Sequence, residues 1–372
     1  MEEISYLFDK MVNHRLKLHK IAEVGRCEFK TSEYIKNYLD SIGVEYKVYL
    51  NTGIVGILKG KNPNKTIAFR SDIDGLRTEH GVEHLCGHDG HMSILLGLIE
   101  YINDNLDKLN DNIVFIFQPA EEGPGGAEEL IKLGALKDFN VDEIFGLHIY
   151  PEIDEGFIGV RDGYFLAQSG EVDIEVISKS AHGAMPQNGN DAVIIMADII
   201  SSLQTIVSRN LSPLDNGVVT IGKVNCGTVR NIIAENAHLE GTIRTYKPET
   251  YEMMKTRVKE ILLGYEIAYN CKINFEIRDF YPAVNNDKNL YKELLNVVSK
   301  DKLIKLDPLM ISEDFSYYQK NVPGLFFMLG SRNKEKGYIN GLHNINFNFD
   351  EKIFLNALDI YVSLLKYKKS IN

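Results

Sequence analysis

The segment Asn112-Ile113-Val114-Phe115-Ile116-Phe117-Gln118 decides the fold of this chain, because every position between its polar ends is apolar. A strand of this kind is covered on both faces, as the central strands of a parallel sheet are. Further strands are predicted at residues 66–70 and 143–147, and an amphipathic helix at residues 93–106 precedes the central segment. This alternation predicts an α/β fold, with a mostly parallel sheet and helices on both faces.

The chain has 372 residues, which exceeds the ~250–300 residues at which single cores stop growing, so two domains are expected. The pattern of apolar residues changes near Ser169. The elements expected beyond this point are strands at 171–178, 217–224, 237–244 and 272–278, and helices at 191–209 and 248–263. Their order, β-α-β-β-α-β, is that of a ferredoxin-like α+β domain. We therefore expect a catalytic domain in two parts, residues 1–168 and 281–372, interrupted by an inserted domain at residues 169–280.

The composition is that of an acidic globular protein. A net charge of -11 disfavours nucleic acid or an anionic membrane surface as partner. No stretch approaches the ~18 uninterrupted apolar residues that favour a spanning helix, so no membrane partner is expected. The four cysteines show no paired spacing, which favours a reducing cytoplasm.

Metal-capable side chains are concentrated in the segment Leu85-Cys86-Gly87-His88-Asp89-Gly90-His91. Cys86 and His88 are two residues apart in a glycine-interrupted loop, so both can turn toward one point. A thiolate with an imidazole favours an ion such as zinc over magnesium or calcium. The alternative is structural, because a single histidine is more often a core or capping residue. Asp89 likewise suits the cap of the following helix.

Glu121 and Glu122 follow the central apolar strand and one proline. Adjacent glutamates are usually a solvated pair, but the end of a central strand is not a solvated environment. Two such carboxylates can divide the work, one binding an ion and the other moving protons. His148 follows a neighbouring strand and can converge with them. The pattern around His343 offers no argument of its own.

These motifs resemble the family of metal-dependent amidohydrolases that includes zinc-type aminoacylases, hippurate hydrolases and auxin-conjugate hydrolases. The matching segments span nearly the whole chain and are Arg70–Asp74, Cys86–His91, Gln118–Glu122, Gly146–His148, His182-Gly183, Gly227–Ile232, Glu240–Thr245, Glu313–Phe315 and Gly341–His343. Within this family, Glu121–Ala127, Arg209-Asn210 with Pro213–Asp215, and Ile233–Glu235 are most similar to bacterial N-acetyldiaminopimelate deacetylases.

The resemblance implies a role for each matching residue. The ligands of two divalent metal ions per subunit (zinc, manganese, cobalt or nickel) would be Cys86, His88, Glu122, His148 and His343. Glu121 would be the general base, and Asp74 would support the metal site. His182, in an inserted dimerisation or lid domain, would reach the active site of the partner subunit in a homodimer. Asn231 and Arg244 would hold the substrate carboxylate.

The activity that the resemblance implies is hydrolysis of the amide bond of an N-acyl amino acid, such as N-acetyl-diaminopimelate or hippurate. A metal-activated water would attack the amide carbonyl, with Glu121 accepting the proton of the water and later giving it to the departing amine. His182 could stabilise the oxyanion that forms. The planar guanidinium of Arg244 suits a carboxylate, since it can bind both oxygens.

Two segments depart from the family pattern. Residues 75–85, between Asp74 and Cys86, form a shorter loop than relatives usually carry, and Ser180–Gln187 differs from the usual sequence around His182. The rim of the substrate site is therefore expected to differ. Three other functions remain open: a dipeptidase or aminopeptidase of the same family, a hydrolase with Cys86 as nucleophile, and a non-catalytic metal-bound assembly protein.

Overall fold

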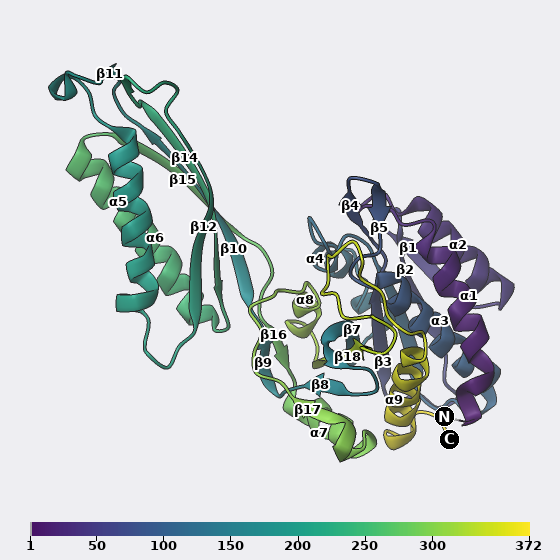
Figure 1. The fold of residues 1–372 in the computed structure, drawn as a ribbon. Coiled ribbons are helices and arrows are strands. Elements are labelled where there is room, and N and C mark those ends of the chain that lie inside the picture. Colours follow the sequence, from purple (N-terminus) through teal and green to yellow (C-terminus); the bar gives the residue numbers. More distant parts are fainter. Residues whose placement is uncertain (1) are drawn as a thin grey trace. The chain divides into compact units, whose positions relative to one another are not determined.

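The computed structural model describes residues 2–372, which form two compact units (Figure 1). The α/β unit comprises the residues up to Phe165 together with Asn285–Asp307 and Asp314–Asn372. The inserted unit comprises Leu166–Val284 and Pro308–Glu313. Each unit has its own cluster of buried apolar residues, so each is described by itself.

The α/β unit is built on an eight-stranded sheet with the order β1-β2-β6-β3-β7-β18-β8-β17. Its four central strands, β6, β3, β7 and β18, run parallel to one another. At the edges, β1 and β2 pair antiparallel, and β8 is antiparallel to β18. The expected mostly parallel sheet is therefore confirmed. The strands are β1 (Tyr46–Tyr49), β2 (Gly53–Leu58), β3 (Thr66–Asp72), β6 (Asn112–Gln118), β7 (Glu143–Asp154), β8 (Ile158–Val160), β17 (Leu303–Lys305) and β18 (Gly324–Arg332).

Helices cover both faces of this sheet, as expected. Consecutive residues of a strand point to opposite faces. On β18, Phe326 packs against Phe315 beside α8, whereas Phe327 packs against Tyr361 of α9. The helices of the unit are α1 (Phe8–His19), α2 (Phe29–Ser41), α3 (His88–Asp104), α4 (Ala127–Lys132), α7 (Lys288–Val297), α8 (Ser316–Gln319) and α9 (Ile353–Tyr367).

Short strand pairs complete the sheet structure outside the large sheets. They are β4 (Leu76–Thr78) with β5 (Gly81–Glu83), β9 (Gly163–Leu166) with β16 (Val284–Asn286), and β11 (Ala181–His182) with β13 (Ile232–Ile233).

The inserted unit has the predicted order β-α-β-β-α-β. Its four strands form an antiparallel sheet in the order β12-β14-β10-β15. The helices α5 and α6 pack together and contribute, with the sheet, to one buried cluster that includes Val172, Leu239 and Met254. The elements are β10 (Gln168–Ile177), α5 (Ala192–Thr205), β12 (Gly217–Cys226), β14 (Asn236–Thr245), α6 (Pro248–Tyr269) and β15 (Lys272–Asp279).

One helix is long and apolar enough to span a membrane, judged by length and composition only. The sequence patterns did not lead us to expect such a helix. The helix Ala192–Asn210 has 19 residues and a mean hydropathy of 1.4. Its buried stripe includes Ile195, Ile199 and Leu203, which lie in the core of the inserted unit. A core helix of a globular protein passes the same test, so this helix is weak evidence for a membrane span.

Candidate metal centre

The site lies where the parallel strands of the α/β unit end. β3 ends at Asp72 and β6 ends at Gln118, so the residues that follow them meet at one edge of the sheet. His148 reaches the same edge from β7. The prediction that its strand ends there is wrong, because β7 continues to Asp154 along β18, whereas its pairing with β3 stops at Gly146.

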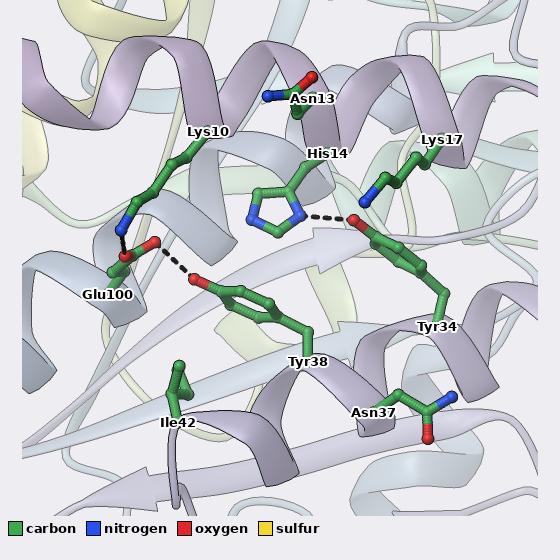
Figure 2. A pocket seen from close by; sticks show the side chains of 9 residues that line it. All are labelled: Lys10, Asn13, His14, Lys17, Tyr34, Asn37, Tyr38, Ile42 and Glu100. Atoms are coloured by element: carbon green, nitrogen blue, oxygen red, sulfur yellow. Dashed lines mark hydrogen bonds and ion pairs between the residues drawn. The ribbon is translucent and has the colours of Figure 1, made fainter.

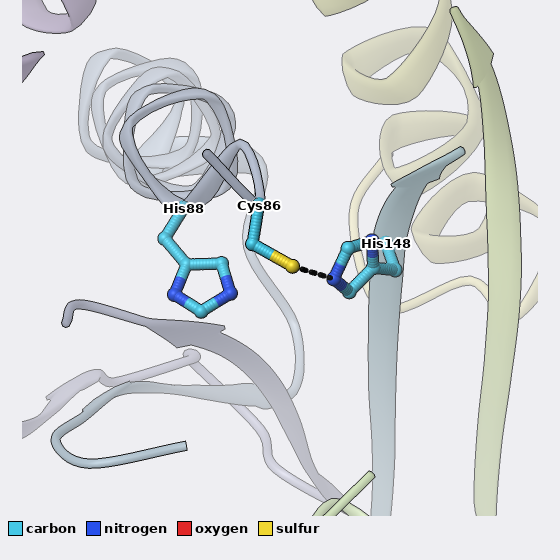
Figure 3. A group of neighbouring side chains, drawn as sticks. All are labelled: Cys86, His88 and His148. Carbon is cyan, nitrogen blue, oxygen red and sulfur yellow. Dashed lines mark hydrogen bonds between the residues drawn. The ribbon is translucent and has the colours of Figure 1, made fainter. Parts of the chain in front are cut away.

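Cys86 and His88 face His148 from the loop before α3 and from its first turn, as Figure 3 shows. Gly87 between them has a φ of +81°, a left-handed conformation that glycine adopts without strain. Cys86 Sγ lies 3.5 Å from His148 Nε2. The prediction that both side chains turn toward one point therefore agrees with the geometry of this loop.

His343 and Glu122 extend the group on the other side of Cys86. His343 Nε2 lies 3.3 Å from Cys86 Sγ and 3.5 Å from Glu122 Oε1. The backbone N–H of His343 donates to Leu85 O over 2.9 Å, and this hydrogen bond holds the loop that carries His343. The structure thus brings together five predicted ligands as two overlapping trios that share Cys86: one with His88 and His148, and one with Glu122 and His343.

Hydrogen bonds orient two of the imidazoles toward the group. His88 Nδ1 lies 2.9 Å from Asp74 O, and His148 Nδ1 lies 2.7 Å from Ile149 O. Because a carbonyl oxygen only accepts, each Nδ1 carries a proton, and Nε2 is the nitrogen that would bind a cation once the ring is neutral. His88 Nε2 is buried without a hydrogen-bond partner among residues 2–372. Backbone-fixed tautomers and an unsatisfied nitrogen are what a metal ligand needs, so these residues fit a cation.

The electrostatics of the group also fit a cation. Burial would lower the pKa of His88, but Asp72 and Asp74 raise it to about 10. Burial and the neighbouring His91 lower the pKa of His148 to about 3. Burial together with Glu122 raises the pKa of the Cys86 thiol. A divalent cation stabilises the thiolate and the carboxylates and favours neutral imidazoles.

The two glutamates lie in a loop that the α/β unit holds at several points. Glu121 is 7% exposed, and its carboxylate groups with His88 and Glu122 within 4.8 Å. Asp74 Oδ2 accepts a hydrogen bond from the Glu122 backbone N–H over 3.0 Å. The Glu28 carboxylate accepts from the N–H of Ala120 over 2.9 Å. A solvated glutamate pair, the alternative from sequence, does not describe this environment.

Beneath this loop lies a buried ionic network whose roles we did not infer from the sequence. Arg70 binds Asp72 through Nη1 and Asp314 through Nη2, each over 2.8 Å. Gln118 binds Asp314 as well, over 2.7 Å. His91 Nδ1 lies 2.7 Å from Asp72 Oδ1. The sequence did indicate that such a network was needed, because charged residues at the end of a fully buried strand require partners.

The prediction that Asp89 caps the following helix is wrong. The N-cap of α3 is Gly87, and no side chain caps the helix. The Asp89 carboxylate instead binds His19 Nδ1 over 2.9 Å and Arg15 Nε over 3.4 Å. It therefore ties α3 to α1.

The other three predicted site residues belong to the inserted unit. His182 lies on β11 and Asn231 beside β13, and both are exposed. Arg244 lies on β14, where its Nη1 donates to Met310 O over 2.7 Å and burial lowers its pKa. Their participation in the site stays a prediction.

A separate pocket of about 470 Å³ lies between α1, α2 and α3 (Figure 2). Its central side chain, His14, is 6% exposed and lies 2.7 Å from Tyr34 Oη through Nδ1. Burial lowers the pKa of His14 to about 4. Lys10 and Tyr38 both bind Glu100 at its rim. This pocket contains none of the five predicted metal ligands.

The fold and this group of side chains define a two-unit metal-binding α/β protein. The model of the family "Peptidase family M20/M25/M40" matches residues 68–367. The chain belongs to this family.

The similarity between this chain and its relatives covers nearly the whole length of both. The N-acetyldiaminopimelate deacetylase of Anoxybacillus flavithermus is 40% identical, over 95% of each chain, and that of Bacillus cytotoxicus is 38% identical, over 96% of this chain and 98% of the relative. A solved structure from methicillin-resistant Staphylococcus aureus has a TM-score of 0.91 at 31% identity, covering 99% of this chain and 98% of its own. The YXEP protein of Bacillus subtilis, described as a dinuclear metal-binding peptidase from the M20 family, has a TM-score of 0.82 at 27% identity over 96% and 97%.

Proposed function

We propose that this protein is a metal-dependent amidohydrolase that removes the acyl group from N-acyl amino acids, with N-acetyldiaminopimelate as the leading substrate. The observation that carries the proposal is Glu121, a buried carboxylate beside a group of five metal-capable side chains. The names of the relatives from Anoxybacillus and Bacillus support the substrate.

The proposed cofactor is a pair of divalent ions, and Cys86 would contribute to holding them. His88 and His148 would hold one ion, and Glu122 and His343 would hold the other. Zinc, manganese, cobalt and nickel all accept this donor set of sulfur, nitrogen and oxygen. When bound, the ions supply Lewis acidity toward the amide carbonyl and make a water molecule acidic near neutral pH. The description of the YXEP protein as dinuclear supports two ions.

The residues of the chain then handle the protons. Glu121 accepts a proton from water as the new C–O bond forms at the acyl carbon. It donates that proton to the nitrogen as the C–N bond breaks, so the products are a carboxylate and a free amino acid. Asp74 positions the loop of Glu121, since it accepts the hydrogen bond from the Glu122 backbone N–H.

The inserted unit is proposed to complete the site. Arg244 and Asn231 would bind the α-carboxylate of the substrate, and His182 of the partner subunit would donate to the oxyanion. Exposed apolar side chains on this unit support a homodimer: Ile194 on α5 is 53% exposed and Ile232 on β13 is 48% exposed. Light scattering on wild-type protein and on Ile194→Glu tests the dimer, and an unchanged mass would count against this surface. The four free cysteines support a cytoplasmic location.

The decisive test is the activity of Glu121 variants toward N-acetyl-diaminopimelate, hippurate and several N-acetyl amino acids, with metal-reconstituted protein. Removing a general base costs roughly 10²–10⁴-fold in rate, and we expect Glu121→Ala and Glu121→Gln to fall in this range. Glu128→Gln, an exposed glutamate on α4, is the control. Wild-type turnover by Glu121→Ala would refute the mechanism.

A dipeptidase is the second candidate, because the YXEP protein is described as a peptidase. Dipeptides belong in the same substrate panel, and a higher kcat/KM for them than for acyl amino acids would favour this function. A Cys86 nucleophile is disfavoured, since Cys86 lies in both groups of metal-capable side chains and the carboxylates of Glu121 and Glu122 would have no role in that mechanism.

A further inference from the structure

The shortened loop between Asp74 and Cys86 forms a small hairpin, and this hairpin encloses a pocket. Strands β4 and β5 pair from Leu76 to Glu83. The pocket has a volume of about 420 Å³ and is lined by residues that include Arg77, Glu79, His80, Leu85, His343 and Ile345. This volume lies within the range of sites for small metabolites.

The pocket adjoins the proposed metal centre through one side chain. His343 lines the pocket, and its Nε2 lies 3.3 Å from Cys86 Sγ. Leu85 forms another part of the wall, and its carbonyl oxygen accepts the His343 backbone N–H. A substrate whose amide lies at the metal centre can therefore extend past His343 into this pocket.

The charged groups of the pocket are a cation and an anion that do not pair with each other. Arg77 and Glu79 are both exposed, and neither makes an ion pair or a side-chain hydrogen bond within the described residues 2–372. Thr78 between them shapes the turn, since its Oγ1 accepts from the His80 N–H over 3.1 Å. The pocket thus offers one fixed turn, one guanidinium and one carboxylate.

These groups match a zwitterion. A guanidinium binds a carboxylate through two parallel hydrogen bonds, and a carboxylate binds an ammonium group. Leu85 and Ile345 add apolar surface suited to methylene groups. A diamino dicarboxylic acid acylated at one end has these parts in this order: an amide, a methylene chain and a distal ammonium with its carboxylate.

We propose that this pocket binds the distal amino acid end of an N-acylated diamino dicarboxylic acid, with Arg77 on the carboxylate and Glu79 on the ammonium group. The proposal rests on the proposed function and deepens it. It makes the hairpin the feature that selects a substrate charged at both ends over an ordinary N-acyl amino acid.

The test compares specificity ratios on the full-length, metal-reconstituted protein. We would measure kcat/KM for N-acetyl-diaminopimelate and for N-acetyl-norleucine, which has no distal charges. Nα-acetyl-lysine keeps only the distal ammonium, and N-acetyl-α-aminopimelate keeps only the distal carboxylate. For Arg77→Gln, the ratio of diaminopimelate to norleucine substrate should fall about tenfold, mainly through KM, because one charge-assisted contact is lost. Glu79→Gln should lower the ratio of the lysine to the norleucine substrate, and Arg77→Gln should not.

Arg257→Gln, at a partly exposed arginine of α6, is the control and should leave every ratio within about twofold. A loss shared equally by all substrates would show a structural role for Arg77 and would overturn the proposal. The proposal would also be overturned if the wild-type enzyme cleaved all four substrates with the same kcat/KM, whatever their distal group. That result would leave the proposed function unaffected. A wild-type enzyme that cleaves no acyl amino acid at any metal loading would overturn both.

Discussion

Replacement of Asp314 by alanine should destabilise the α/β unit strongly and displace the loop of Glu121. The Asp314 carboxylate is fully buried and accepts hydrogen bonds from four groups. They are Arg70 Nη2 at 2.8 Å, Gln118 Nε2 at 2.7 Å, and the backbone N–H groups of Gly126 and Ala127 at 3.0 and 3.1 Å. The variant removes the carboxylate that these four donors share, and it takes one carboxylate partner away from the buried guanidinium of Arg70.

The size of the effect follows from this geometry. Removing one partner of a buried ion pair costs about 3–5 kcal/mol, since the other charge stays buried. A typical domain has only about 5–15 kcal/mol of stability, so the loss is a large fraction of the total. Activity should fall as well, because Gly126 and Ala127 anchor the far end of the segment that carries Glu121.

The assay is chemical denaturation of chelator-treated protein, which separates the network from any stabilisation by bound metal. Asp138→Ala is the matched control: its carboxylate also accepts two side-chain hydrogen bonds, from Lys47 and Tyr49, but at the surface. It should lose far less stability than Asp314→Ala. A loss below about 1 kcal/mol for Asp314→Ala would refute the reasoning, since even an ordinary hydrogen bond contributes that much.

Three further predictions follow from the same structure. Burial lowers the pKa of His14 from 6.5 to about 4, so the unfolded chain takes up a proton at a higher pH than the folded chain does. The free energy of unfolding should therefore fall by up to about 3 kcal/mol as the pH drops from 6.5 to 4. His14→Phe should remove this part of the pH dependence in chelator-treated protein, whereas the exposed control His238→Gln should retain it. A strong chelator should abolish hydrolysis, and zinc, manganese or cobalt should restore it; activity that survives chelation would exclude the metal mechanism. Arg244→Lys should raise KM more than it lowers kcat, because one ammonium cannot replace the guanidinium fork, and an unchanged KM would remove Arg244 from the carboxylate site.

Local patterns in the sequence were sufficient for the main elements of the fold. The apolar segment at residues 112–118 predicted a central strand, and β6 spans the same residues. Apolar alternation after Ser169 predicted the β-α-β-β-α-β order of the inserted unit. Cys86 and His88 could also be predicted as neighbours, because a glycine turn joins them. These features depend on residues close together in the chain, where periodicity and turn chemistry act directly.

Only the tertiary structure decided the features that depend on distant contacts. His343 had no support from its local pattern, yet its imidazole lies 3.3 Å from Cys86 Sγ because its loop is hydrogen-bonded to Leu85 O. Asp314 gained its partners on three other segments, and Pro308–Glu313 belongs to the inserted unit although it follows the α/β strand β17. The sequence by itself determined which chemistry the chain carries, since side-chain type and local spacing are written in it. The fold determined which groups meet, because burial and hydrogen bonding join segments that no local pattern connects.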